Sequence, residues 1–173
     1  MQMPRLCLFR HAKSDWFAGA TNDFDRPISS RGERDAPLVI AYLIAKGWKP
    51  DRILCSPAKR ARQTLEILAG VLECEPEIMF PAGLYDASVA DYAGLIRTHG
   101  GDAELLMVIG HNPMMHDTAL SLAAPGNSPK AAGPAKKFPT SAIAVLDFTT
   151  KWADIAGRSG KLVAFVKPTD LRK

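Results

Sequence analysis

The sequence has few cysteines and no long apolar run, and these absences exclude several classes of protein. No apolar stretch approaches the ~18 residues that a membrane-spanning helix needs, so we expect no membrane association. The first residues lack the apolar stretch and cleavage site of a secretory signal, which predicts a cytoplasmic protein. The three cysteines are odd in number and form no Cys-x-x-Cys pair, so neither a disulfide framework nor a zinc site is expected.

Aromatic residues are also scarce, at 8% of the chain, and the basic residues are scattered rather than arranged in a stripe. The net charge of +4 favours anionic ligands, but this pattern argues against nucleic acid and favours a phosphorylated ligand. His111 and His116 are five residues apart, a spacing less suited to shared metal ligation on a helix than i, i+4. We therefore expect no metal and no other cofactor.

Length and apolar content allow one core. The chain has 173 residues, 47% of them apolar, and is too short for two ordinary domains, so a single domain over residues 1–173 is predicted. Short apolar runs that read as strands alternate with helical patterns. This alternation predicts an α/β fold, a three-layer αβα sandwich around a mostly parallel sheet. The predicted strands are 5–9, 53–55, 78–80, 105–109, 141–148 and 161–166, and the predicted helices are 32–46, 58–72, 87–97 and 114–122.

Smaller features refine this outline. Gly47 is expected to end the first helix in a left-handed conformation, and Ser56-Pro57 is typical of a helix start. The segment 124–139 is rich in Pro, Gly, Ala and Lys, which predicts a long surface loop. The last two strands are predicted to pair as a hairpin.

Polar residues with phosphate chemistry follow three predicted strands. Arg10 and His11 follow the first strand, and His111 follows the fourth. The turn after the second strand presents Arg60 and Arg62. Ligands of open α/β sheets bind at the carboxyl ends of strands. The arginine guanidinium suits phosphate oxygens, and a histidine kept neutral by neighbouring cations can attack phosphorus. These residues predict a phosphoryl-transfer site.

Three fragments resemble the histidine phosphatase superfamily, also called phosphoglycerate mutase-like: Arg10-His11, Ser56-Pro57-Ala58-Lys59-Arg60-Ala61-Arg62-Gln63-Thr64 and Gly110-His111-Asn112-Pro113. Within it, the chain is most similar to the small SixA-type phosphohistidine phosphatase branch, through residues 10–16, 25–28 and 138–144. The resemblance implies a phosphoglycerate mutase-like fold and a metal-independent phosphatase. Ala12 departs from the commoner Arg-His-Gly triplet, and should be harmless only if its φ is not positive.

The resemblance also implies roles for individual residues. His11 would accept the phosphoryl group, Arg10 and Arg60 would bind its oxygens, and His111 would contact the same group. Ser14 and Asn112 are further candidates for phosphate binding.

The general acid is left open. Asp86 is the nearest candidate carboxylate after the third strand, and it could equally be the N-cap of the helix that follows. Asp25 and Arg26 either organise their loop or touch substrate, and Trp16 with Phe17 either walls the pocket or anchors the loop to the core.

The sequence favours a phosphatase acting on phosphohistidine in a protein, because the chain lacks the long insertions that cap a metabolite pocket in mutases. The partner would then be a phosphorylated protein, such as a phosphohistidine domain. The alternatives are a small-molecule phosphomonoesterase or phosphoglycerate mutase-like enzyme, whose partner is a small phosphorylated metabolite, and a non-catalytic phosphate-binding module.

Overall fold

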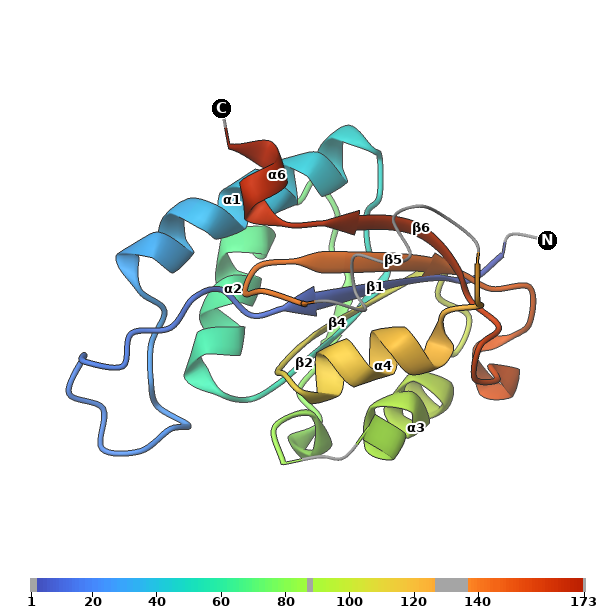
Figure 1. Cartoon of the computed structure of the whole chain (residues 1–173), viewed down its shortest axis with the longest axis horizontal. Helices are drawn as coiled ribbons and strands as arrows, with labels where there is room; N and C mark the ends of the chain where they lie inside the picture. The colour runs from blue at the N-terminus through green and yellow to red at the C-terminus, as the bar shows by residue number, and fades with distance from the viewer. Residues whose placement is uncertain (1–2, 87–88, 127–136, 173) are drawn as a thin grey trace.

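The computed structural model describes residues 3–86, 89–126 and 137–172, and its elements alternate as predicted (Figure 1). The strands are β1 (Arg5–Arg10), β2 (Arg52–Cys55), β3 (Glu77–Met79), β4 (Leu105–Gly110), β5 (Ile143–Asp147) and β6 (Lys161–Val166). The helices are α1 (Ser30–Ala45), α2 (Lys59–Ala69), α3 (Val89–His99), α4 (Met114–Leu122) and α6 (Pro168–Leu171), with short 3-10 turns η1 (Ala82–Leu84) and η3 (Trp152–Asp154). The predicted strands and helices are all present with small shifts of boundary. Part of the predicted loop, residues 127–136, and the start of the third predicted helix, residues 87–88, lie outside the described residues.

The six strands form one sheet in the order β3-β2-β4-β1-β5-β6. Strands β1 to β4 are mutually parallel, whereas β5 pairs antiparallel with both β1 and β6. The predicted mostly parallel sheet and the terminal hairpin are therefore confirmed. Strand β4 lies between β2 and β1, so the ends of these three strands are side by side.

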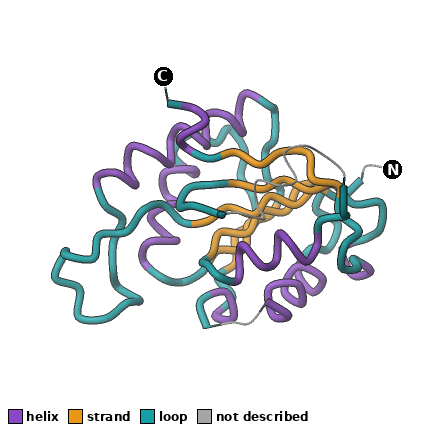
Figure 2. Tube along the Cα trace, in the orientation of Figure 1, coloured by secondary structure: helices purple, strands orange, loops and turns teal. Residues whose placement is uncertain are grey.

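Helices cover both faces of the sheet, which gives the three predicted layers (Figure 2). Along β1, Leu6 and Leu8 belong to the core beneath α3 and α4, whereas Cys7 and Phe9 belong to the core beneath α1 and α2. All four side chains are fully buried. A strand covered on both faces is apolar at every position, and this explains the unbroken apolar runs of β1 and β4.

The ends of α1 follow the local chemistry of the sequence. Oγ of Ser29 accepts a hydrogen bond from the Gly32 N–H at 3.2 Å, and Gly47 has φ of 70° after the helix, as predicted. A Cβ on Gly32 would lie 2.4 Å from the carbonyl oxygen of Lys13, so only glycine lets α1 approach the segment that follows β1 so closely.

The start of α2 corrects one prediction. The helix begins at Lys59 after Ala58, which has no side chain to cap it, and Ser56 lies before the cap position. Oγ of Ser56 accepts a hydrogen bond from the Ala58 N–H at 3.3 Å, which is not a helix cap. The same hydroxyl also contacts His111, in the site described below. Within the described residues, no helix is both long enough and apolar enough to cross a bilayer.

Candidate active site

Three neighbouring strands bring the predicted site residues to one edge of the sheet. Arg10 pairs with Gly110, and Cys55 pairs with Ile109, so β1, β4 and β2 end almost level. The residues that follow these ends line one cavity of about 490 Å³, here called the strand-end cavity. Its lining consists of Arg10, His11, Lys13, Ser14, Trp16, Asp23, Arg26, Arg60, Tyr85, Asp86, His111, Asn112, Met114 and Thr140. All seven residues predicted to act on the phosphoryl group are among them, whereas Arg62 is not, because its Nε donates to the Pro57 carbonyl oxygen at 2.8 Å.

His11 is held by one ring nitrogen. The residue is only 5% exposed, and its Nδ1 lies 2.8 Å from the carbonyl oxygen of Ala12. Because a carbonyl oxygen only accepts hydrogen bonds, Nδ1 carries the proton and Nε2 keeps its lone pair. Nε of Arg60 lies 3.4 Å from this Nε2. Burial lowers the pKa of His11 well below its usual value, and His111, Arg60 and Arg10 act in the same direction, so the ring is neutral at pH 7.

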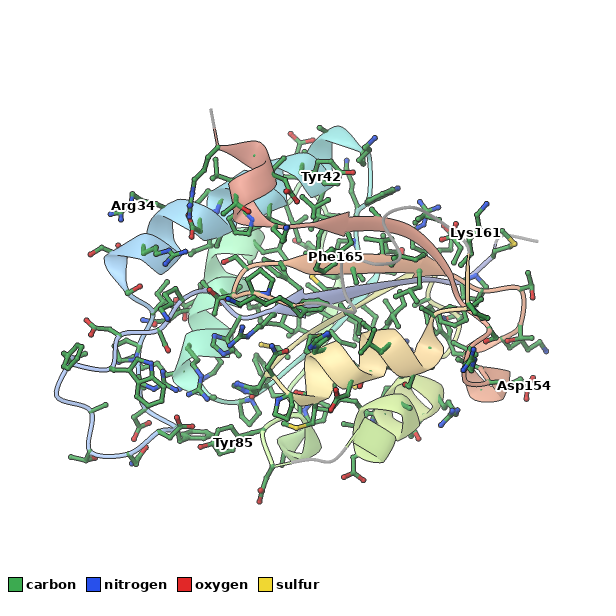
Figure 3. All side chains as sticks on the ribbon, viewed as in Figure 1. Arg34, Tyr42, Tyr85, Asp154, Lys161 and Phe165 are labelled. Carbon is green, nitrogen blue, oxygen red and sulfur yellow. The ribbon has the colours of Figure 1, made fainter. Side chains whose placement is uncertain are left out.

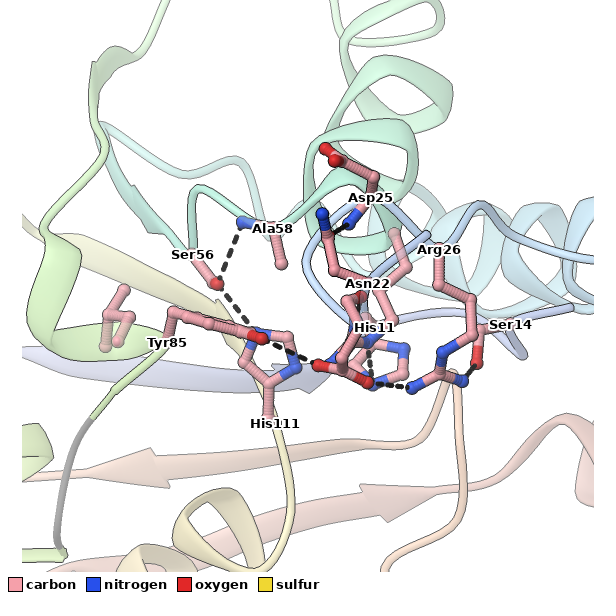
Figure 4. A network of polar contacts seen from close by, with 12 residues as sticks. His11, Ser14, Asn22, Asp25, Arg26, Ser56, Ala58, Tyr85 and His111 are labelled. Atoms are coloured by element: carbon pink, nitrogen blue, oxygen red, sulfur yellow. Dashed lines mark hydrogen bonds and ion pairs between the residues drawn. The ribbon is translucent and has the colours of Figure 1, made fainter. Parts of the chain in front are cut away.

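His111 lies beside His11, with ring centroids 5.0 Å apart and ring planes tilted by 53°. Its Nε2 is 2.6 Å from Oγ of Ser56, and its backbone N–H donates to the Tyr92 hydroxyl at 3.1 Å. Burial, followed by the charge of Arg60, lowers the pKa of His111 to about 4. The cavity therefore contains two adjacent neutral imidazoles, each held at one nitrogen (Figure 4).

Three arginines surround the two rings. Arg60 and Arg26 are buried, at 5% and 8% exposure, and Nη1 of Arg10 donates to the carbonyl oxygen of Phe138 at 3.0 Å. Burial, and then the charge of Arg60, lowers the pKa of Arg10, but a guanidinium remains charged at neutral pH. Three cations thus line one cavity, which favours an anionic ligand. Arg26 was expected either to organise its loop or to touch substrate. It lines the cavity and also binds Asp23 of its own loop.

Asp23 is a site residue that the sequence analysis missed, as is Tyr85. Its carboxylate accepts hydrogen bonds from Arg26 Nη2 at 2.7 Å, Arg60 Nη2 at 3.0 Å and the Tyr85 hydroxyl at 2.8 Å. Burial acts to raise the pKa of Asp23, but these three hydrogen bonds outweigh it and hold the pKa well below its usual range. The ionised carboxylate therefore occupies the arginine cluster as a bound anion would. No pattern in the sequence separates Asp23 from Asp25, which does not line the cavity.

Asp86 and Tyr85 reach the cavity from the segment after η1. The Tyr85 ring packs edge-on against His111, with centroids 5.6 Å apart, and Asp86 is exposed at the rim. Figure 3 shows Tyr85 at the opposite end of the molecule from Asp154 and Lys161. The alternative role of Asp86 as a helix N-cap involves residues 87–88, which lie outside the described residues.

Ser14 and Asn112 line the cavity but also support its walls. The Ser14 hydroxyl accepts a hydrogen bond from Nη1 of Arg26. Asn112 donates from Nδ2 to the carbonyl oxygen of Phe138 at 2.9 Å and accepts at Oδ1 from the His116 N–H at 3.2 Å. Asn112 therefore fixes the turn into α4, and its amide keeps one N–H and one oxygen lone pair for a ligand.

Two further expectations concern the loop after β1. Ala12 is buried and is not among the described residues with positive φ, so its methyl group is accommodated without strain. Trp16 lines the cavity and stacks over the Arg26 guanidinium at 3.5 Å, as expected of a wall. Phe17 is 97% exposed, so it neither lines the cavity nor anchors the loop to the core.

The cysteines lie apart from this chemistry. Burial raises the pKa of Cys7 and of Cys55 to about 12, so both are inert thiols in the core. Among the residues that the structure describes, no group of three or more His, Cys, Asp or Glu side chains is placed to hold a metal ion.

Comparisons with known proteins identify the family. A sequence profile described as "Histidine phosphatase superfamily (branch 1)" matches residues 6–107. An uncharacterized protein of Mycobacterium tuberculosis, MT1313, is 37% identical over 161 residues, which cover 92% of this chain and 99% of that protein. An uncharacterized chloroplastic protein of Arabidopsis thaliana, At3g52155, is 31% identical over 178 residues, covering 95% of this chain and 78% of that protein.

Solved structures agree with the family and with the fold. A protein assigned as the phosphohistidine phosphatase SixA from Nakamurella multipartitia has a TM-score of 0.85 at 27% identity, with 97% of this chain and 98% of that chain covered. The corresponding protein from Agrobacterium tumefaciens has a TM-score of 0.79 at 30% identity, with 95% and 98% covered. The chain therefore belongs to the histidine phosphatase superfamily, branch 1, and to its SixA-type members.

Proposed function

We propose that this phosphatase acts through a covalent phosphohistidine intermediate on Nε2 of His11, and that its substrate is a phosphohistidine side chain in a protein. The state of His11 is the observation that carries the proposal. The ring is buried and neutral, Ala12 holds the proton on Nδ1, and the lone pair of Nε2 lies beside Arg60. A nitrogen nucleophile in this state needs neither a metal ion nor another base to activate it.

The reaction proceeds in two displacements. First, the Nε2 lone pair attacks phosphorus, and the bond to the leaving group breaks with its electrons going to the leaving atom. The departing imidazole takes up a proton from solvent. Water then attacks phosphorus from the vacated side and returns a proton to solvent, and the N–P bond breaks to return the electron pair to Nε2. Inorganic phosphate is released, and His11 is regenerated.

The hydrogen-bond donors around the cavity stabilise the negative charge of the phosphoryl group. Arg10, Arg60 and His111 contact the phosphoryl oxygens, with Ser14 and Asn112 at the edge of the same cavity. Because negative charge shifts between the leaving group and these oxygens, donors already in place stabilise the transition state. Loss of one such donor typically lowers kcat by about 10²–10³.

The acids of the cavity favour a substrate whose leaving group departs readily. Asp23 is held ionised by Arg26 and Arg60, so it has no proton to give at neutral pH. Asp86 is the remaining carboxyl in the lining, and it is exposed at the rim. An imidazole leaving from phosphohistidine needs less protonation than an alkoxide does. The exposed rim at Trp16 also leaves room for a side chain presented by a protein surface.

A small-molecule phosphomonoesterase is the second candidate, and the position of Asp86 favours it. A carboxyl at the rim of the cavity is where an alkoxide leaving group would need its proton. Replacement of Asp86 by Asn should then lower turnover of an alkyl phosphate and leave turnover of phosphohistidine unchanged.

Trapping of the intermediate tests the proposal. Brief incubation with a labelled phosphohistidine protein should give an acid-labile, base-stable phosphoenzyme. His11→Ala should abolish trapping and activity, whereas His99→Ala, which changes a histidine outside the cavity, should affect neither. Turnover of small phosphate esters alone would leave the second candidate, and phosphate binding without any phosphoenzyme would identify a non-catalytic module.

A further inference from the structure

The ring of His111 contacts a hydroxyl group, so its partner does not by itself show which ring nitrogen carries the hydrogen. The Ala12 carbonyl can only accept, so the tautomer of His11 follows directly. Oγ of Ser56, 2.6 Å from Nε2 of His111, can either donate or accept. Because the ring is neutral at pH 7, only one of its nitrogens carries a hydrogen, and the direction of this one bond decides which.

The other contacts of Ser56 decide the direction. Ser56 is fully buried, and its Oγ already accepts the N–H of Ala58 at 3.3 Å. Among the described residues, Nε2 of His111 is the acceptor within reach of the hydroxyl hydrogen. If Nε2 were protonated, this hydrogen would be a buried donor without a partner, which folded proteins avoid. The hydroxyl therefore donates to Nε2.

The opposite nitrogen of the ring completes the argument. Nδ1 of His111 is buried and has no hydrogen-bond partner in the described part of the chain, and the ring lines the strand-end cavity. Figure 4 shows the His111 ring between Ser56 on one side and His11 and Arg26 on the other. A hydrogen on Nδ1 is thus a donor held ready for a ligand, whereas a lone pair there would repel a phosphoryl oxygen.

We propose that Ser56 is a positioning residue that donates to Nε2 of His111 and so fixes the neutral tautomer with its hydrogen on Nδ1, directed at the phosphoryl oxygens. The proposal rests on the function given above, in which His111 contacts the transferred group. The sheet supplies the contact, because β2 and β4 are neighbours and the Ser56 N–H donates to the Ile109 carbonyl oxygen at 2.9 Å. Ser56 acts on the reaction only through His111.

Imidazole ¹⁵N NMR reads the tautomer directly and without substrate. The chain has four histidines, so the long-range ¹H–¹⁵N correlations of a labelled sample are few enough to assign. In the wild-type protein at pH 7, in phosphate-free buffer, both His11 and His111 should carry hydrogen on Nδ1. A His111 ring protonated at Nε2 would overturn the proposal whatever the enzyme activity, and no variant is needed for this result.

Variants test the role of the hydroxyl. Ser56→Ala should give His111 the Nε2-protonated form or a mixture, leave the His11 pattern unchanged, and lower kcat by about 10²-fold, the usual loss for a misplaced donor. Ser56→Thr restores a hydroxyl and should restore the His111 tautomer. Thr118→Val is the matched control, because Thr118 is buried on α4 with a hydroxyl that has no partner among the described residues.

The outcomes separate the two proposals. Ser56→Ala with an unchanged His111 tautomer and unchanged kcat would refute the positioning role. A predicted tautomer in a protein that forms no phosphoenzyme would instead refute the proposed function and leave the tautomer assignment intact.

Discussion

The neutral state of His111 makes the stability of the fold depend on pH. Its pKa is about 4 in the folded protein against 6.5 for the unperturbed side chain. Between these values the unfolded chain binds a proton that the folded protein does not, so stability is fully present above pH 6.5 and is lost as pH falls through 4. Over the whole range this amounts to about 3 kcal/mol, of which about 2 kcal/mol is lost by pH 5.

His111→Gln removes this titration and isolates its contribution. Urea unfolding at pH 7.5 and at pH 5.0, in buffer without phosphate, gives the free energy of unfolding of each protein at both values. The loss between the two pH values should be smaller in the variant by about 2 kcal/mol. His111 is also one of the causes that lower the pKa of His11, so its removal acts on the pH dependence of His11 in the same direction.

The comparison within each protein cancels any constant effect of the substitution on packing. Equal losses in the wild type and in His111→Gln would show that His111 titrates alike in the folded and unfolded states. The burial and the charges around its ring would then not keep it neutral, and the account of the site given above would be wrong.

Three other predictions concern the site and its support. Arg60→Ala should lower kcat by about 10²–10³ and also weaken inhibition by inorganic phosphate, because the guanidinium binds the group in both ground and transition states; unchanged inhibition would contradict this. Asp23→Asn should lower the Kd for phosphate roughly 2- to 5-fold by calorimetry, since the carboxylate competes for Arg60 and Arg26, and an ion pair with a half-exposed carboxylate is worth at most about 1 kcal/mol. Weaker binding would mean that Asp23 orients the arginines instead. Gly110→Ala should lower Tm, because a Cβ there would lie 2.4 Å from the Tyr92 hydroxyl oxygen; an unchanged Tm would show that the ring can move aside.

Most of the fold could be predicted from local patterns. The apolar runs of β1 and β4 match strands covered on both faces, and Gly47 ends α1 where only a left-handed residue fits. His11 and His111 could be placed at one edge because parallel strands carry the residues after them to a common side. The start of α2 was predicted less well, since a Ser-Pro pair also fits the turn before the cap.

Several contacts of the site could not be found in this way. Asp23 and Tyr85 reach the cavity from two loops 62 residues apart, and neither loop has a periodic pattern that indicates where its side chains point. The bond of Ser56 to His111 joins residues 55 apart and depends on β2 lying next to β4. Strand order is a property of the assembled sheet, so no local pattern specifies it.

The sequence by itself determined the alternation of strands and helices, the residues that follow each strand, and the resemblance that made His11 the expected nucleophile. These are local properties, set by the apolar period and by the residue types at the strand ends. Only the tertiary structure decided how those residues act on one another. Burial and the neighbouring cations keep both imidazoles neutral, Asp23 places an anion among the arginines, and Ser56 contacts Nε2 of His111. Charge and protonation depend on distances across the assembled sheet, which the order of residues along the chain does not contain.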